Sequence, residues 1–78
     1  MAKNVKVYST PTCPWCIRVK QFLRDNNIAF EDYDVSVDHA KGDEMVAKSG
    51  QMGVPVIDIE GEIIVGFDKE RIKSALGL

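Results

Sequence analysis

The feature that most constrains this chain is a pair of cysteines, Cys13 and Cys16, separated by two residues, of which the first is Pro14. The sequence contains no other cysteine. A disulfide between them would close so short a loop that it would restrict the unfolded chain little, and its stabilising effect would be small. We therefore interpret the pair as a site of redox or metal chemistry.

Pro14 determines the local structure of this pair, because proline suits the first position of a helix and not its interior. With Pro14 in that position, Cys13 is the N-cap, and its sulfur faces the unpaired N–H groups of Trp15 and Cys16. These amides and the positive end of the helix dipole favour the thiolate over the thiol, so we predict that Cys13 is the nucleophile. Cys16 lies on the same face nearly one turn deeper, where we predict a shielded resolving thiol.

Hydrophobic periodicity and turn residues predict the element order βαβαββα. The predicted strands cover residues 5–8, 28–35, 54–59 and 62–65, and the predicted helices cover residues 14–25, 38–49 and 68–76. A helix joins the first two strands, so they should run parallel through a right-handed crossover, and the final hairpin should add to the same sheet. We expect one α/β domain spanning residues 1–78, with a four-stranded mixed sheet flanked by three helices.

Composition excludes several classes of function. Ten basic and twelve acidic residues are spread along the chain and leave a net charge of −2. This distribution offers no basic patch for nucleic acid, so we expect no nucleic-acid partner. No apolar run approaches the roughly twenty residues that span a bilayer, and the start of the chain does not resemble a signal peptide. We therefore expect a soluble, cytoplasmic monomer without a membrane partner, whose cysteines rest as thiols.

A structural metal is not expected, because a closed zinc site needs four ligands. Apart from Cys13 and Cys16, the chain offers only His39 as a nitrogen or sulfur ligand of the usual kind. We interpret His39 as a solvated residue in the first turn of the second helix. We therefore predict no metal-binding residues and expect no prosthetic group.

Three motifs, in this order, resemble the glutaredoxins of the thioredoxin-fold superfamily, and the resemblance covers essentially the whole chain. Cys13-Pro14-Trp15-Cys16 is similar to the dithiol active site of the family, with Trp15 where tyrosine is usual. Gly53-Val54-Pro55 resembles the Thr-Val-Pro loop, whose proline is cis. Gly66-Phe67-Asp68 lies where glutaredoxins carry a Gly-Gly segment followed by acidic residues.

The resemblance implies a thioredoxin-like fold and a thiol–disulfide oxidoreductase that uses glutathione as co-substrate. Its substrates would be protein disulfides and glutathione mixed disulfides. A cis Pro55 would turn the backbone of Val54 outward to pair with glutathione, and Phe67 and Asp68 would receive the γ-glutamyl end. The residues predicted to bind glutathione are Thr12, Trp15, Val54, Pro55, Phe67 and Asp68.

Departures from the family pattern leave two alternatives open. Thr10 stands where many glutaredoxins carry a lysine that meets the glycine carboxylate of glutathione, and Gly53 replaces the usual threonine. Gly66-Phe67 also resembles the NrdH-type redoxins, which take electrons from thioredoxin reductase. The other alternative is a carrier or scaffold for a glutathione-ligated [2Fe-2S] cluster, against which Pro14 argues, since relatives that bind such clusters usually lack this proline.

Overall fold

The computed structural model describes residues 4–78 and has the predicted order of elements. The elements are β1 (Val5–Ser9), α1 (Pro14–Asp25), β2 (Glu31–Asp34), α2 (His39–Ser49), β3 (Val56–Ile59), β4 (Glu62–Val65) and α3 (Lys69–Leu76). The sheet order is β2-β1-β3-β4; β1 runs parallel to β2, while the β1–β3 and β3–β4 pairs are antiparallel. The predicted α/β fold with a four-stranded mixed sheet and three helices is confirmed.

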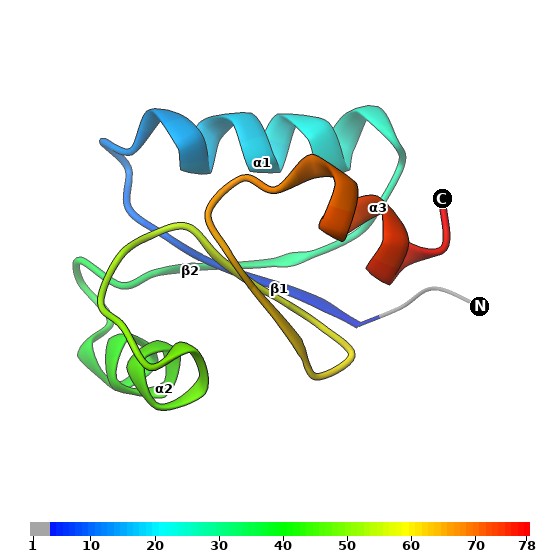
Figure 1. Cartoon of the computed structure of the whole chain (residues 1–78). Helices are drawn as coiled ribbons and strands as arrows, with labels where there is room; N and C mark the ends of the chain where they lie inside the picture. Colours follow the sequence, from blue (N-terminus) through cyan, green and yellow to red (C-terminus); the bar gives the residue numbers. More distant parts are fainter. Residues whose placement is uncertain (1–3) are drawn as a thin grey trace.

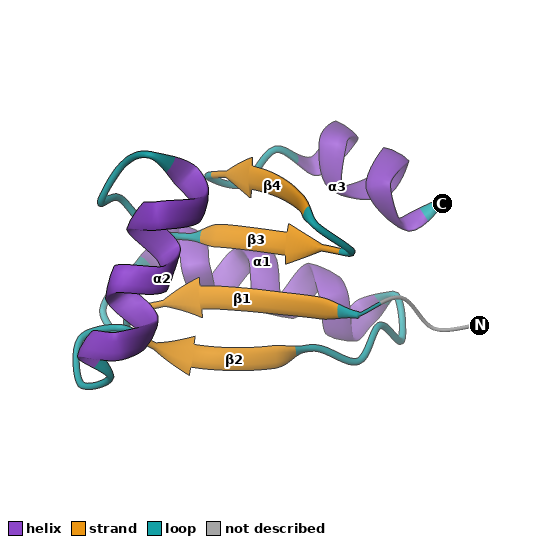
Figure 2. Ribbon diagram, turned by 90° about the horizontal axis from the view of Figure 1, so that it is seen from below, coloured by secondary structure: helices purple, strands orange, loops and turns teal. Residues whose placement is uncertain are grey.

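The helices divide between the two faces of the sheet. Helices α1 and α3 cover one face, and α2 lies across the other (Figure 1). Viewed from the α2 side, the strands lie in the order β4, β3, β1, β2, with α1 behind them (Figure 2). The first strand is therefore central, and its carboxyl end leads directly into α1.

Two predicted strand boundaries were wrong. Strand β2 covers only Glu31–Asp34, because the chain after α1 first completes the end of the helix. Asn27 adopts a left-handed conformation with φ of 57°, and the N–H of Ile28 donates to the carbonyl of Leu23 at 2.9 Å. Strand β3 begins at Val56, since Pro55 before it has no N–H to donate to a strand ladder.

Alternation along the strands separates two cores. The larger one lies between the sheet and helices α1 and α3, and its buried residues are Val5, Val7, Val19, Leu23, Ile57, Ile59, Ile64, Ile72 and Ala75. The smaller one lies under α2 and contains Tyr8, Met45 and Val56. Of the apolar residues of α2, only Met45 is buried, while Val46 is 37% exposed. Apolar burial therefore accounts for only part of the packing of α2 against the sheet.

A polar cluster supplies further contacts between α2 and the sheet. The Nζ of Lys48 lies 2.7 Å from Oδ2 of Asp58 on β3 and 3.0 Å from the hydroxyl of Tyr8, which donates to Glu44. Burial raises the pKa of the Asp58 carboxyl, but the hydrogen bonds from Lys48 and from the N–H of Gly61 outweigh it, so this pKa is below its usual value. Lys48 is thus a surface residue whose ammonium group is held by partners on two strands, β1 and β3.

We predict that Lys48→Met destabilises the protein by about 1–2 kcal/mol, the usual contribution of a charged hydrogen bond reduced for partial exposure. Because the pKa of Asp58 is lower when folded, its stabilisation is present at neutral pH and is lost as the pH falls through the folded value. The loss in the variant should therefore shrink in acid. Urea denaturation at several pH values measures it.

The control is Lys73→Met, which removes a lysine from α3, on the opposite face of the sheet. It should change the free energy of unfolding by less than about 0.5 kcal/mol. Equal effects of the two substitutions would mean that the cluster does not anchor α2.

Candidate active site

Cys13 is the N-cap of α1, as predicted, and Pro14 is the first residue of that helix. Cys13 has an extended backbone, with φ of −89° and ψ of 113°, and its Sγ accepts the N–H of Cys16 at 3.2 Å. Its own N–H donates to the carbonyl of Thr10 at 3.4 Å, which fixes the loop before the helix. The sulfur of Cys13 thus occupies the place of the oxygen in an ordinary serine or aspartate cap.

The two thiols have different environments. Cys13 is half-buried, whereas Cys16 is fully buried with 0% of its surface exposed. The pKa of the Cys16 thiol is raised to about 12, first by burial and then by the adjacent Cys13 sulfur, although the backbone of Thr10 and the charge of Lys20 oppose the rise. At neutral pH Cys16 is therefore a protonated, shielded thiol, while Cys13 is open to solvent.

The loop before β3 passes directly beside Cys13. The Val54–Pro55 peptide bond is cis, as expected. The carbonyl oxygen of Val54 lies 3.9 Å from the Sγ of Cys13, and the carbonyl of Pro55 accepts the N–H of Gly66 at 2.8 Å. Cys13, the candidate nucleophile, therefore lies next to the Val54–Pro55 segment. A hydrogen bond to Gly66, which directly follows β4, holds this segment in place.

A hollow of about 280 Å³ opens at this point and is lined by Trp15, Val54, Pro55, Gly66 and Phe67. Four of the six residues predicted to bind glutathione are thus brought together. The Trp15 side chain is 53% exposed. Phe67 is half-buried, and its ring centroid lies 5.9 Å from that of Phe22, so this side chain also packs against α1.

The other two predicted residues, Thr12 and Asp68, are exposed and do not line the hollow. Asp68 is the N-cap of α3, and its Oδ1 accepts the N–H of Arg71 at 3.2 Å. It lies immediately after Phe67 in the chain, so the amino end of α3 follows the wall of the hollow. Thr12 is exposed and lies immediately before Cys13 in the chain.

Sequence reasoning missed two features near the thiols. The side chain of Lys20 is only 15% exposed, and its Nζ lies 2.9 Å from Oδ2 of Asp32 and 3.3 Å from Oγ of Ser9. Its position four residues after Cys16, on the same helix face, was the available signal. Arg18 places its guanidinium 4.7 Å from the ring centroid of Trp15.

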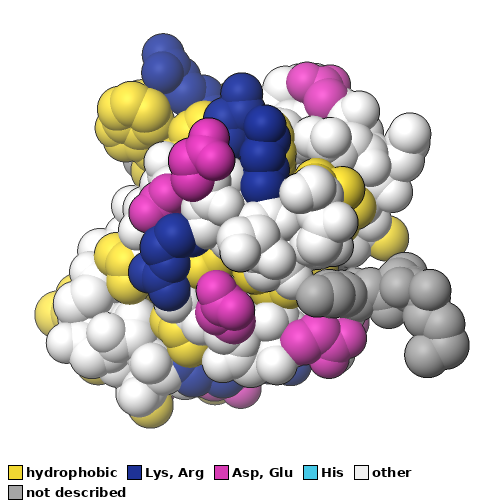
Figure 3. Space-filling model, turned by 45° about the vertical axis from the view of Figure 1, so that its right-hand side comes forward, with side chains coloured by type: hydrophobic (Ala, Val, Ile, Leu, Met, Phe, Trp, Pro, Cys, Tyr) yellow, Lys and Arg dark blue, Asp and Glu magenta, His cyan; other side chains and the backbone are white. Residues whose placement is uncertain are grey.

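The remaining surface has no strong bias of charge where it can be seen. Figure 3 shows basic and acidic side chains interspersed among apolar ones on the face that it draws. Within residues 4–78 we find no group of three or more His, Cys, Asp or Glu residues arranged to hold a metal ion. In the same part of the chain, no helix has the length and apolarity needed to cross a membrane.

Comparisons with known proteins agree with this geometry. The family described as Glutaredoxin matches residues 5–64. An uncharacterized glutaredoxin-like 8.6 kDa protein in the rubredoxin operon of Clostridium pasteurianum is 53% identical over 92% of this chain and 96% of its own length. Glutaredoxin 3 of Escherichia coli K12 is 37% identical over 95% of this chain and 89% of its own.

A crystal structure of a thioredoxin-like protein superposes with a TM-score of 0.90 at 35% identity, covering 95% of each chain. The similarity therefore extends over nearly the whole chain.

We predict that limiting iodoacetamide at neutral pH alkylates Cys13 at least roughly ten-fold faster than Cys16, because alkylation needs an accessible thiolate. Burial and the pKa of about 12 withhold Cys16 from reagent. Mass spectrometry of tryptic peptides measures both rates. In urea the two rates should become similar. Faster alkylation of Cys16 in the folded protein would reverse the assignment of roles.

Proposed function

This chain belongs to the glutaredoxin family and is a thiol–disulfide oxidoreductase, and from that premise we propose that it reduces disulfides with electrons from glutathione. In this proposal Cys13 is the nucleophile and Cys16 the resolving thiol. The observation that carries it is the convergence of Cys13, the Val54 backbone and the hollow beside Trp15 and Phe67 at the amino end of α1.

With a protein disulfide, both cysteines take part. The Cys13 thiolate attacks one sulfur of the substrate, forming a mixed disulfide as the substrate S–S bond breaks and the leaving thiolate takes up a proton. Cys16 then loses its proton and attacks the Cys13 sulfur, which releases the second substrate thiol and leaves a Cys13–Cys16 disulfide. Two glutathione molecules reduce that disulfide and become glutathione disulfide. The rates depend on thiolate fraction, the pKa of the leaving group and access.

With a glutathionylated substrate, Cys13 alone suffices. Its thiolate attacks the glutathione sulfur, the substrate leaves as a thiol, and a glutathionyl group remains on Cys13. A second glutathione attacks this mixed disulfide and regenerates the thiolate with release of glutathione disulfide. Burial of Cys16 supports this route, because a shielded thiol competes slowly with free glutathione.

Several contacts support glutathione as the molecule bound. Val54 is half-buried beside the Cys13 sulfur, in a segment outside the ladder of β3, where an extended tripeptide can pair with its backbone. The hollow beyond it is lined by the predicted residues Trp15, Pro55 and Phe67. Asp68 at the amino end of α3 offers a carboxylate for the γ-glutamyl ammonium, and the helix end offers amides for its carboxylate.

The alternative electron donor is thioredoxin reductase, as for NrdH-type redoxins. Thr10 favours it, since this side chain supplies no positive charge for the glycine carboxylate of glutathione. We prefer glutathione because an exposed ion pair contributes only about 0.2–1 kcal/mol, so its absence should weaken binding and not abolish it. An alternative from another functional class is a carrier of a glutathione-ligated [2Fe-2S] cluster, and Pro14 argues against it.

A cytoplasmic location suits the proposed thiol–disulfide chemistry, since the dithiol must be kept reduced.

We predict that the wild-type protein turns over a glutathionylated peptide with glutathione, glutathione reductase and NADPH, and that Cys16→Ser keeps this activity while losing reduction of protein disulfides. Cys13→Ser should abolish both. NADPH consumption measures each reaction. If glutathione supports no turnover while thioredoxin reductase readily reduces the Cys13–Cys16 disulfide, the donor is the NrdH-type one.

A second pair of variants tests how glutathione is held. Thr10→Lys should lower the KM for glutathione by about two- to five-fold, because one exposed ion pair is gained. Asp68→Ala should raise this KM by losing the contact to the γ-glutamyl ammonium, and Asp68→Asn, which keeps an N-cap, separates that effect from helix capping. Salt should diminish the first effect. Unchanged constants in both variants would place glutathione elsewhere.

A further inference from the structure

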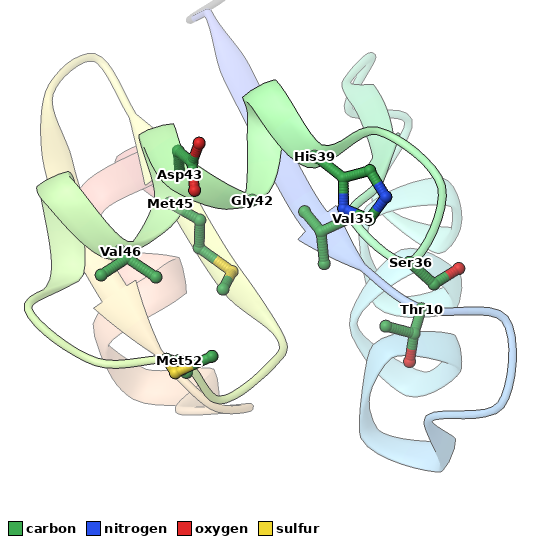
Figure 4. Close-up of a pocket in the computed structure, with 9 residues that line it drawn as sticks. All are labelled: Thr10, Val35, Ser36, His39, Gly42, Asp43, Met45, Val46 and Met52. Carbon is green, nitrogen blue, oxygen red and sulfur yellow. The ribbon is translucent and has the colours of Figure 1, made fainter.

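A second pocket, of about 300 Å³, lies on the α2 side of the site and has no part in the chemistry described above. Its apolar lining consists of Val35, Met45, Val46 and Met52. Figure 4 shows Val35 and Thr10 on one side, Met45, Val46 and Met52 on the other, and Gly42 on the α2 ribbon between them. The absence of a side chain at Gly42 helps keep this space open.

Both walls of the pocket continue into the candidate active site. On one wall, Thr10 lines the pocket and accepts the N–H of Cys13 through its carbonyl at 3.4 Å. On the other wall, Met52 lies two residues before Val54, whose carbonyl is 3.9 Å from the Cys13 sulfur. A polypeptide joined to Cys13 and paired with Val54 can therefore extend toward this pocket at one end and toward the hollow at Trp15 and Phe67 at the other.

The chemistry of the pocket selects its occupant. Met52 is 82% exposed and Val46 is 37% exposed, so two apolar side chains of the lining remain in contact with water. Covering them with an apolar group is favourable. The carboxylate of Asp43 also lines the pocket and disfavours an acidic group. The volume is at the small end for ligand sites, which suits one side chain better than a cofactor.

We propose that this pocket is a subsite for protein substrates, which receives one apolar side chain on the carboxyl side of the cysteine bound to Cys13. The direction rests on the proposed function, in which the amino-terminal γ-glutamyl group of glutathione lies at Phe67 and Asp68. The glycine that ends glutathione then points toward Thr10 and has no side chain to fill the pocket. A longer polypeptide in the same direction does. The pocket thereby distinguishes protein disulfides from glutathione.

The subsite should affect the rate of the first thiol–disulfide exchange, in which the mixed disulfide with Cys13 forms. The Cys13 thiolate attacks a peptide disulfide, the Cys13–peptide S–S bond forms, the original S–S bond breaks, and the leaving peptide thiolate is protonated. In Cys16→Ser the mixed disulfide is not resolved and accumulates. Its rate of formation, followed by mass spectrometry with no glutathione present, reports how well the attached peptide fits.

The test uses single-cysteine peptides as their symmetric disulfide dimers. Leucine, serine or aspartate is placed in turn at each of four positions, which are the two before and the two after the cysteine. At one or two positions on the carboxyl side, leucine should accelerate trapping by roughly ten-fold over serine, as expected for filling an apolar subsite. Aspartate should be slower than serine there. On the amino side, leucine can be favoured only by the separate hollow at Trp15 and Phe67, so any preference there should be insensitive to substitutions in the α2 pocket.

A pocket-filling variant supplies the structural control. A Cβ built on Gly42 meets Val35 at 3.8 Å, an ordinary contact, so Gly42→Leu places a side chain in the pocket without a clash at its base. In the Cys16→Ser background it should abolish the leucine preference, while the reaction with glutathione disulfide stays unchanged. Ala47→Leu, on the same helix outside the pocket lining, should keep the preference. Val46→Ser should reduce it and serves if Gly42→Leu fails to fold.

Equal rates for leucine and serine on the carboxyl side, or a carboxyl-side leucine preference that survives in Gly42→Leu, would overturn the subsite. A preference confined to the amino side would also overturn it, because the direction would be reversed. These results are independent of the electron donor, since trapping needs no glutathione. Failure of the proposed function would instead appear as absent turnover with glutathione reductase, whatever the peptides show.

Discussion

The rest of the site depends on one hydrogen bond, from the N–H of Cys16 to the Sγ of Cys13. It makes a sulfur the N-cap of α1 and thereby aims the amino end of that helix at Cys13. The same geometry places Cys16 inside the first turn, where it is buried and its pKa is raised to about 12. One local structure therefore distinguishes two chemically identical thiols.

The fold brings a second backbone segment to the capped helix. The inner strand β1 ends four residues before Cys13, and its antiparallel neighbour β3 begins just after Val54 and Pro55. The thiol and this backbone segment therefore lie at the same end of the sheet. Val54 lines the hollow at Trp15 and Phe67, and Met52, two residues earlier in the chain, lines the pocket beside α2. Lys48 and Asp58 help hold α2 against the sheet and so stabilise the second of these surfaces.

Local rules predicted the features that depend on neighbours in sequence: the cap at Cys13, the start of α1 at Pro14 and the order of elements. They failed where distant residues decide the outcome. Lys20 on α1 pairs with Asp32 on β2. Lys48 on α2 pairs with Asp58 on β3. Each pair joins a helix to a strand, and the sequence pattern of the helix alone does not predict it. The pocket at Gly42 was equally hidden, because its walls come from three separate segments. Pro55 and Phe67 reach one hollow only through the pairing of β3 with β4.

In the proposed reaction, substrate sulfur is exchanged at the capped thiol of Cys13 and not at the buried thiol of Cys16. Reaction of the reduced protein with a small excess of glutathione disulfide, quenched within seconds by acid and mapped by tandem mass spectrometry, tests it directly. We predict that the transient glutathionyl group is found on Cys13, followed by the Cys13–Cys16 disulfide. Glutathione found first on Cys16, or equally on both cysteines, would contradict it.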